Sequence, residues 1–190
     1  MKYLIVYAHP DPDSFNRAIL GAVERRLKET GCRYDVRDLY ALGFDPVLAR
    51  EELVPGGAKS VPEDVERERK YIAEADTLIF IYPVWWFAMP AIMKGYVDRV
   101  FSEGFAFVSE GGRLRGLLGG KKAFIINTTG APREILSRMG YLDAMSKTTD
   151  AGIFEFCGME IVEHRYLFAV PEAGKTARMI MLEEVTKMGF

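Results

Sequence analysis

The chain has 190 residues, of which 49% are hydrophobic and 27% are charged, and its formal net charge is −2 at pH 7. This is ordinary globular composition, which argues against disorder and predicts a single domain over residues 1–190. The small net charge gives no overall basic field, so nucleic acid is not an expected partner.

The first third of the chain reads as strand, helix, strand. Residues 3–8 form a continuous apolar run, as in a central parallel strand that helices cover on both faces. Apolar residues then recur at helical spacing from Phe15 to Leu27, and Gly31 provides a stop signal. Residues 34–39 alternate charged and apolar side chains, which favours a strand at the edge of a sheet.

The remaining elements repeat this alternation. Proline and glycine residues in the stretch 45–62 predict a long surface loop, and a charged helix is expected at residues 65–75. The further predicted elements, in chain order, are a buried strand at 77–82, a helix at 90–101, a glycine-rich connection at 111–120, a strand at 122–127, a helix at 133–149, a strand at 161–170 and a helix at 172–188. Five strands alternating with helices predict an α/β fold, a three-layer flavodoxin-like sandwich around a five-stranded parallel sheet.

The cysteines and the hydropathy of the sequence indicate whether to expect disulfides, metal sites or transmembrane segments. Cys32 and Cys157 lie far apart and have no metal-ligand spacing, so we expect reduced thiols, no disulfide framework and no metal site. No apolar run approaches the roughly 18 residues of a membrane span. We therefore expect a cytoplasmic protein without a transmembrane segment.

Three unusual segments, 9–16, 83–89 and 128–133, each follow a predicted buried strand. Because the carboxyl ends of parallel strands meet at one edge of the sheet, these segments should converge there. The second segment begins Pro83-Val84-Trp85-Trp86-Phe87, and its rigid aromatic faces predict a wall for a planar ligand. The alternative is that these aromatic side chains fill a core.

The first segment suits a phosphate group. Ser14, Phe15 and Asn16 open a helix, where free backbone N–H groups and the positive end of the helix dipole favour an anion. A plain helix N-cap is an alternative role for Ser14. His9 has two roles open to it, a ligand contact or a hydrogen-bonded imidazole in a surface loop.

The third segment, Thr128-Thr129-Gly130-Ala131, offers two hydroxyls and exposed backbone, although a turn without a ligand has the same pattern. Together the three segments supply a phosphate corner, an aromatic wall and a polar rim. This is the set of contacts that a flavin mononucleotide or dinucleotide needs.

Several ordered motifs extend this pattern: His9-Pro10, Ser14-Phe15-Asn16, Pro83-x-x-Trp86-Phe87-x-x-Pro90-Ala91-Ile92-x-Lys94-Gly95, Asp98-Arg99-Val100-Phe101, Gly104-Phe105-Ala106-Phe107 and Thr128-Thr129-Gly130. By these motifs the chain resembles the flavodoxin-like NAD(P)H:quinone oxidoreductases from residue 1 to about 170. The resemblance implies a homodimeric flavoprotein that transfers hydride from NAD(P)H through FMN or FAD to a quinone by a ping-pong mechanism.

The resemblance also assigns site residues. It implies that His9, Ser14, Phe15, Asn16 and Ala18 hold the cofactor phosphates, that Pro83, Val84, Trp85, Trp86 and Phe87 border the isoalloxazine, and that Thr128, Thr129, Gly130 and Ala131 bind the flavin edge. The residues do not decide between FMN and FAD.

The chain departs from the family after Thr-Thr-Gly. The animal enzymes carry a tyrosine and a histidine there that stabilise developing charge, whereas here no histidine lies between His9 and His164. Tyr141 is the candidate replacement for the catalytic tyrosine, and Arg133 or Arg138 can supply positive charge. His164 itself is expected to be structural.

The missing pair keeps a second function open. Instead of a quinone reductase, the chain can be a catalytically weak flavin-binding regulatory subunit in peripheral contact with a potassium efflux transporter in the membrane. An electron-carrier flavodoxin is a third reading, and the His9-Pro10-Asp11-Pro12-Asp13 segment argues against it because flavodoxins have a hydroxyl-rich loop there.

Overall fold

Five parallel strands form the central sheet in the order β2-β1-β3-β6-β7. The computed structural model describes residues 1–53 and 61–190. The strands are β1 (Lys2–Tyr7), β2 (Arg33–Asp38), β3 (Thr77–Pro83), β6 (Lys122–Thr128) and β7 (Glu160–Leu167). The predicted three-layer flavodoxin-like fold is confirmed, and β2 lies at an edge of the sheet as its mixed pattern indicated.

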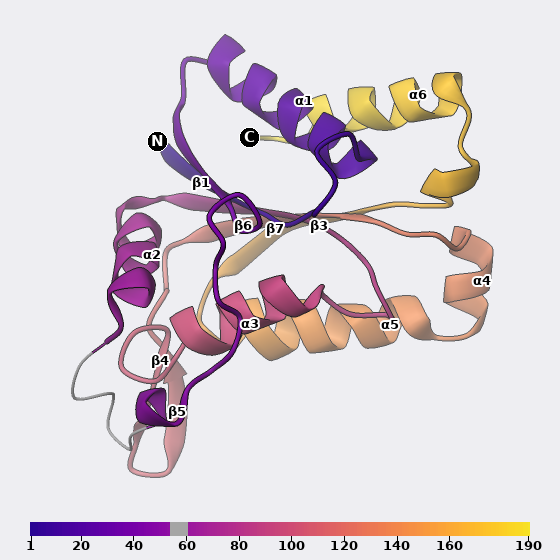
Figure 1. Cartoon of the computed structure of the whole chain (residues 1–190). Helices are drawn as coiled ribbons and strands as arrows, with labels where there is room; N and C mark the ends of the chain where they lie inside the picture. The colour runs from indigo at the N-terminus through magenta and orange to yellow at the C-terminus, as the bar shows by residue number, and fades with distance from the viewer. Residues whose placement is uncertain (54–60) are drawn as a thin grey trace.

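Helices cover both faces of this sheet (Figure 1). The long helices α1 (Phe15–Glu29) and α6 (Lys175–Thr186) lie on one face, and α2 (Glu63–Glu74), α3 (Ala91–Val100) and α5 (Tyr141–Ser146) lie on the other. The shorter elements are α4 (Arg133–Arg138), the 3-10 turns Arg50–Glu52 and Val170–Glu172, and the π-helical segment η2 (Lys147–Glu155).

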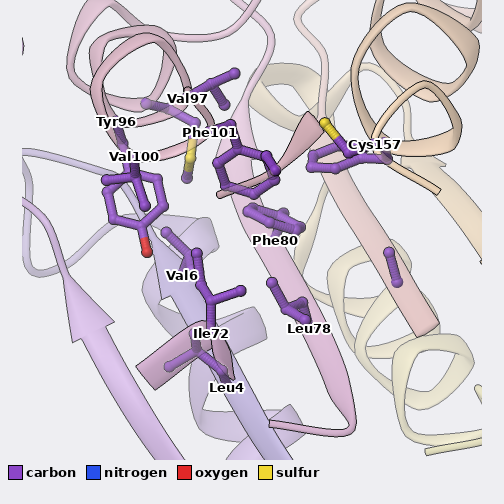
Figure 2. Packing of buried hydrophobic residues seen from close by; sticks show 14 of the residues in the cluster. Leu4, Val6, Ile72, Leu78, Phe80, Tyr96, Val97, Val100, Phe101 and Cys157 are labelled. Carbon is purple, nitrogen blue, oxygen red and sulfur yellow. The ribbon is translucent and has the colours of Figure 1, made fainter. Parts of the chain in front are cut away.

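Two hydrophobic cores hold the layers together, because each buried strand sends alternate side chains to opposite faces. Tyr3 and Ile5 of β1 belong to the core under α1 and α6, whereas Leu4 and Val6 belong to the core under α2 and α3. Figure 2 shows the second core, where the Phe80 ring lies near that of Phe101, with centroids 6.4 Å apart. Burial on both faces explains why the central strands are continuously apolar.

The predicted glycine-rich connection at 111–120 is partly wrong. Residues on either side of Gly111 and Gly112 form an antiparallel hairpin of β4 (Phe107–Glu110) and β5 (Arg113–Gly116). Both glycines have positive φ, 60° and 77°, as the central residues of a tight hairpin turn require. The hairpin carries few buried residues, so its strands lack the apolar pattern that identified the others.

The predicted helix at 133–149 is also broken. Gly140 has a φ of 73°, which ends α4 and begins α5, and the helical path then continues as η2 to Glu155. Strand β7 ends at Leu167 instead of 170, because Ala169 turns the chain with a φ of 50°, and the last helix starts at Lys175. Residues 54–60 of the predicted surface loop lie outside the described residues.

A close backbone approach fixes the loop after β2 against α3. A Cβ atom at Gly95 would lie 2.2 Å from the carbonyl oxygen of Pro46, so only glycine allows these segments to touch. Gly21 in α1 is different, since a Cβ there meets nothing within 4 Å.

The pair of glycines gives a prediction for stability. Gly95→Ala should lower the free energy of unfolding by about 2 kcal/mol or more, because the new methyl group overpacks the contact with Pro46. Gly21→Ala is the matched control and should raise it by about 0.5–1 kcal/mol, because alanine is the better helix former. Urea unfolding followed by circular dichroism measures both, and an unfolding free energy of the Gly95 variant equal to the wild-type value would contradict the contact.

Candidate functional site

The three predicted segments meet at the carboxyl edge of the sheet, and a contact joins each pair. The rings of His9 and Trp85 lie 6.0 Å apart between centroids, in an edge-to-face arrangement. The Asn16 side-chain amide donates to Thr128 Oγ1 at 2.8 Å, and the backbone N–H of Val84 donates to the Thr128 carbonyl at 2.8 Å. The three segments are therefore in direct contact with one another.

Free backbone donors lie at the first turn of α1. The Ser14 hydroxyl is an N-cap, since it accepts a hydrogen bond from the Arg17 N–H at 3.2 Å. The N–H groups of Phe15 and Asn16 have no hydrogen-bond partner among the described residues. The cap and the anion site are thus compatible, because capping uses the third N–H and leaves two donors for a ligand.

The buried amide of Asn16 is incompletely satisfied. Only 3% of the residue is exposed, and its Oδ1 has no hydrogen-bond partner within the described part of the chain. Rotation of the amide by 180° lets the Thr128 hydroxyl donate to Oδ1 and frees the NH2 group. In the first orientation the free Oδ1 can accept from a ribityl hydroxyl, and in the rotated one the free NH2 group can donate to a phosphate.

His9 and Ala18 lie beside this turn. The His9 Nδ1 accepts from the Asp11 N–H at 3.1 Å, which holds the imidazole within its loop. Ala18 is exposed on the first turn of α1. Tyr7, which the sequence analysis did not single out, ends β1 with its hydroxyl 3.4 Å from Ser14 Oγ. Burial raises the pKa of Tyr7, so the phenol is neutral there.

The aromatic segment is a surface feature, and the alternative of a core plug is wrong for its aromatic residues. Trp86 is 94% exposed, and Trp85 and Phe87 are 42% and 43% exposed. Pro83 is buried at the end of β3, and Val84 is half-buried. The aromatic rings thus stand on a fixed base and offer apolar faces to a ligand.

The turn itself is strained. Trp85 and Ala88 exchange two backbone hydrogen bonds of 3.1 Å, and the two residues between them, Trp86 and Phe87, have φ values of 51° and 59°. Bulky residues with positive φ are rare outliers, and each costs about 1 kcal/mol or more. Strained backbone of this kind concentrates at ligand clamps and active sites.

The third segment offers backbone donors on a rigid support. Thr129 is buried and tied to the end of β7, since its N–H donates to the Leu167 carbonyl at 2.9 Å. Its hydroxyl donates to the Ala131 carbonyl at 2.8 Å. The N–H groups of Gly130 and Ala131 have no hydrogen-bond partner in the described ranges, and Gly130 is exposed.

Tyr141 joins the aromatic segment. Its ring stacks on that of Phe87, with centroids 3.9 Å apart and planes at 22°. The half-buried Tyr141 is the first residue of α5, directly after the left-handed Gly140. Arg133 and Arg138, the candidate positive charges, are exposed on α4.

A groove continues from the phosphate turn between α1 and α6. Its volume is about 380 Å³, and Phe15, Ala18, Lys175, Arg178 and Leu182 are among its lining residues. The Arg178 guanidinium lies over the Phe15 ring at 5.7 Å, and its Nε is buried with no hydrogen-bond partner among the residues described. The sequence analysis missed these α6 residues because a lone arginine on an amphipathic helix carries no signal.

The structure also bears on the cysteines, on metal binding and on membrane-spanning helices. Cys32 and Cys157 are free thiols, and burial raises the pKa of Cys157 to about 11. Within residues 1–53 and 61–190 no group of His, Cys, Asp and Glu is placed to hold a metal ion. No helix of these ranges is long and apolar enough to cross a membrane.

Comparison with known proteins places the chain in a family. The family described as flavodoxin-like fold matches residues 1–188. The chain is 37% identical over 184 residues to an uncharacterized NAD(P)H oxidoreductase of Haemophilus influenzae, covering 96% of this chain and 91% of that protein. It is 34% identical over 203 residues to the ribosyldihydronicotinamide dehydrogenase (quinone) of Pongo abelii, covering 95% and 87%.

A solved structure agrees with these sequences. The NAD(P)H:quinone oxidoreductase from Methanothermobacter marburgensis has a TM-score of 0.87 and 32% identity, covering 98% of this chain and 94% of that one. The resemblance that the motifs predicted is confirmed. The chain belongs to the flavodoxin-like fold family and, within it, to the group whose members are named NAD(P)H oxidoreductases and quinone dehydrogenases.

Proposed function

We propose that this protein is a flavin-dependent oxidoreductase that transfers hydride from NAD(P)H through a bound flavin to a quinone or a similar acceptor. The main support is that the three segments at the carboxyl edge of the sheet meet there and that each presents unused binding groups. These groups are the N–H donors of Phe15 and Asn16, the exposed faces of Trp85 to Phe87, and the N–H donors of Gly130 and Ala131. The names of the relatives support the same reaction.

Three groups of residues would contact the flavin. The first turn of α1 and the Asn16 amide would hold the phosphate, His9 and Ala18 would flank it, and the aromatic segment would cover one face of the ring. Thr128 to Ala131 would bind the ring edge, where fixed backbone donors stabilise negative charge. When bound, the flavin supplies the hydride chemistry, and the protein orients it.

The proposal predicts that the protein binds flavin, which gives it a yellow colour, and that it oxidises NADH or NADPH. Purified protein, or protein mixed with FMN or FAD, should show flavin absorbance, and adding NADH or NADPH should bleach it until a soluble benzoquinone restores it. Asn16→Leu should weaken flavin binding by about tenfold or more, because it removes the polar side chain that a phosphate or ribityl group would contact. A folded wild-type protein that stays colourless with both flavins would refute the proposal.

The same experiment separates the second candidate. Bound flavin with negligible NAD(P)H oxidation would favour the regulatory subunit of a potassium efflux transporter, for which the missing tyrosine and histidine pair is the supporting observation. Brisk turnover favours the enzyme. Contact with a transporter stays a prediction, as does the homodimer, which sedimentation at micromolar concentration would test.

Tyr141 is proposed as the residue that stabilises charge on the reacting ring. Its stack on Phe87 brings the phenol to the aromatic wall, where no other described tyrosine ring stacks. Tyr141→Phe keeps the stack and removes the hydroxyl, so kcat should fall by about tenfold or more, with the flavin spectrum unchanged. Stopped-flow measurement of flavin reduction tests this; a rate within twofold of wild type would assign Tyr141 to packing alone.

The groove between α1 and α6 favours FAD over FMN. It adjoins the phosphate turn and provides an arginine, a lysine and the Phe15 ring, which suit a second phosphate and an adenine. Arg178→Met keeps the aliphatic stem, and it should weaken FAD binding by about tenfold while leaving FMN binding unchanged. Equal affinity of the wild-type protein for FMN and FAD by fluorescence titration would contradict the use of this groove.

A further inference from the structure

A chain of buried polar residues runs beneath the site on the face of the sheet opposite α1 and α6. It links η2 to β7, β6 and β3 through Asp150, His164, Asn127 and Tyr82. The side chain of His164 is 7% exposed and that of Asp150 is 15% exposed. Neither the proposed hydride transfer nor the binding contacts described above use this chain of residues.

The Asn127 amide determines which atoms donate and which accept in the hydrogen bonds between these residues. The Asn127 Nδ2 donates to the buried carbonyl of Tyr82 at 3.0 Å, so its Oδ1 faces His164 as an acceptor, 2.7 Å from Nε2. The other ring nitrogen, Nδ1, lies 2.7 Å from Asp150 Oδ1, and the Ser146 hydroxyl donates to Asp150 Oδ2 at 2.7 Å. The His164 Nε2–H therefore donates to Asn127 Oδ1, and Nδ1 lies against the Asp150 carboxyl group.

The surroundings keep this pair isolated. The Tyr166 ring stacks on His164, with centroids 4.1 Å apart. Burial, reinforced by the charge of Asp150, raises the pKa of Tyr166, and burial also raises the pKa of Tyr82. Both phenols are neutral, so neither adds a charge to the cluster around His164 and Asp150.

The hydrogen-bonded series of residues ends at Tyr82, next to the candidate site. Tyr82 and Asn127 face each other across β3 and β6, and the next pair along the same strands is Pro83 and Thr128. The Asn127 amide thus links the two strands one residue before the aromatic segment and the Thr-Thr-Gly segment separate. Just beyond this pair, the Val84 N–H donates to the Thr128 carbonyl at 2.8 Å.

We propose that His164 is a positioning residue for the cofactor site, acting through Asn127 to hold the ends of β3 and β6 at the spacing that the aromatic and Thr-Thr-Gly segments need. Asp150 of η2, which accepts a hydrogen bond from Ser146 at the end of α5, fixes the imidazole. Segments of π-helix often occur at functional sites. Loss of the His164 donor leaves Asn127 Oδ1 buried and unsatisfied, so the amide no longer holds the Tyr82 carbonyl. The role in cofactor binding rests on the proposed function, whereas the link between the strands does not.

The test compares three variants without any ligand. His164→Leu removes both ring nitrogens, and with them the donor to Asn127. His164→Gln can restore the donor to Asn127, because its terminal amide reaches the position of Nε2. Phe154→Leu is the matched control, since Phe154 is a fully buried residue of the same π-helical segment and its ring packs on Phe80, with centroids 4.5 Å apart.

Hydrogen exchange of the Val84 amide in the apo protein is the deciding measurement. His164→Leu should speed this exchange by about tenfold or more over the Phe154→Leu rate, and His164→Gln should return it to near the wild-type rate. Equal exchange in the His164→Leu and Phe154→Leu proteins would overturn the proposal. If His164→Leu does not fold, Asn127→Val decides in its place, because it removes the bond to Tyr82 directly and should speed Val84 exchange in the same way.

Flavin titration then tests the link to the cofactor. His164→Leu should raise the flavin dissociation constant by about tenfold, with recovery in His164→Gln and no comparable change in Phe154→Leu. An unchanged dissociation constant in His164→Leu would overturn the role in cofactor binding. A wild-type protein that binds no flavin would refute the proposed function, and the exchange of Val84 would still report on the link between the strands.

Discussion

The candidate site depends on Thr128, which contacts both of the other segments. Its hydroxyl accepts from Asn16 at the start of α1, and its carbonyl accepts from Val84 at the start of the aromatic segment. Because the residue is 5% exposed, both hydrogen bonds lie in a poorly solvated place where an unpaired group is costly. The parallel sheet brings the three loops to one edge, and Thr128 then sets their spacing.

A rigid base allows the aromatic segment to carry strain. Trp86 and Phe87 keep positive φ values only because Trp85 and Ala88 close the turn and because buried Pro83 and Met89 anchor its ends. An exposed aromatic face and a strained turn are both unfavourable for folding alone. Their joint occurrence next to unused backbone donors is understood if a flat ligand covers the rings.

The sequence predicted the sheet and the meeting of the loops because these depend on patterns that are local and strong. Continuous apolar runs identified β1, β3 and β6, and the order of elements placed Ser14, Trp86 and Thr128 at one edge. The hairpin of β4 and β5 was missed because its strands bury little. The Asp150–His164–Asn127 contacts were missed because they join residues from three elements, and no spacing along the chain encodes such a contact.

The break between helices α4 and α5 shows how a local backbone conformation determines the position of a side chain. A continuous helix over residues 133–149 would carry Tyr141 along the helix axis, and its ring would have no fixed relation to the aromatic segment. The left-handed Gly140 instead ends α4 and restarts the helix, and the Tyr141 ring lands on Phe87. A side chain at residue 140 would be strained at this φ, so the glycine determines where the Tyr141 ring is placed. Among the described residues, Tyr141 is the only tyrosine whose ring stacks on Phe87. The tyrosine that we propose in place of the family's tyrosine and histidine pair thus has a position that depends on a backbone turn.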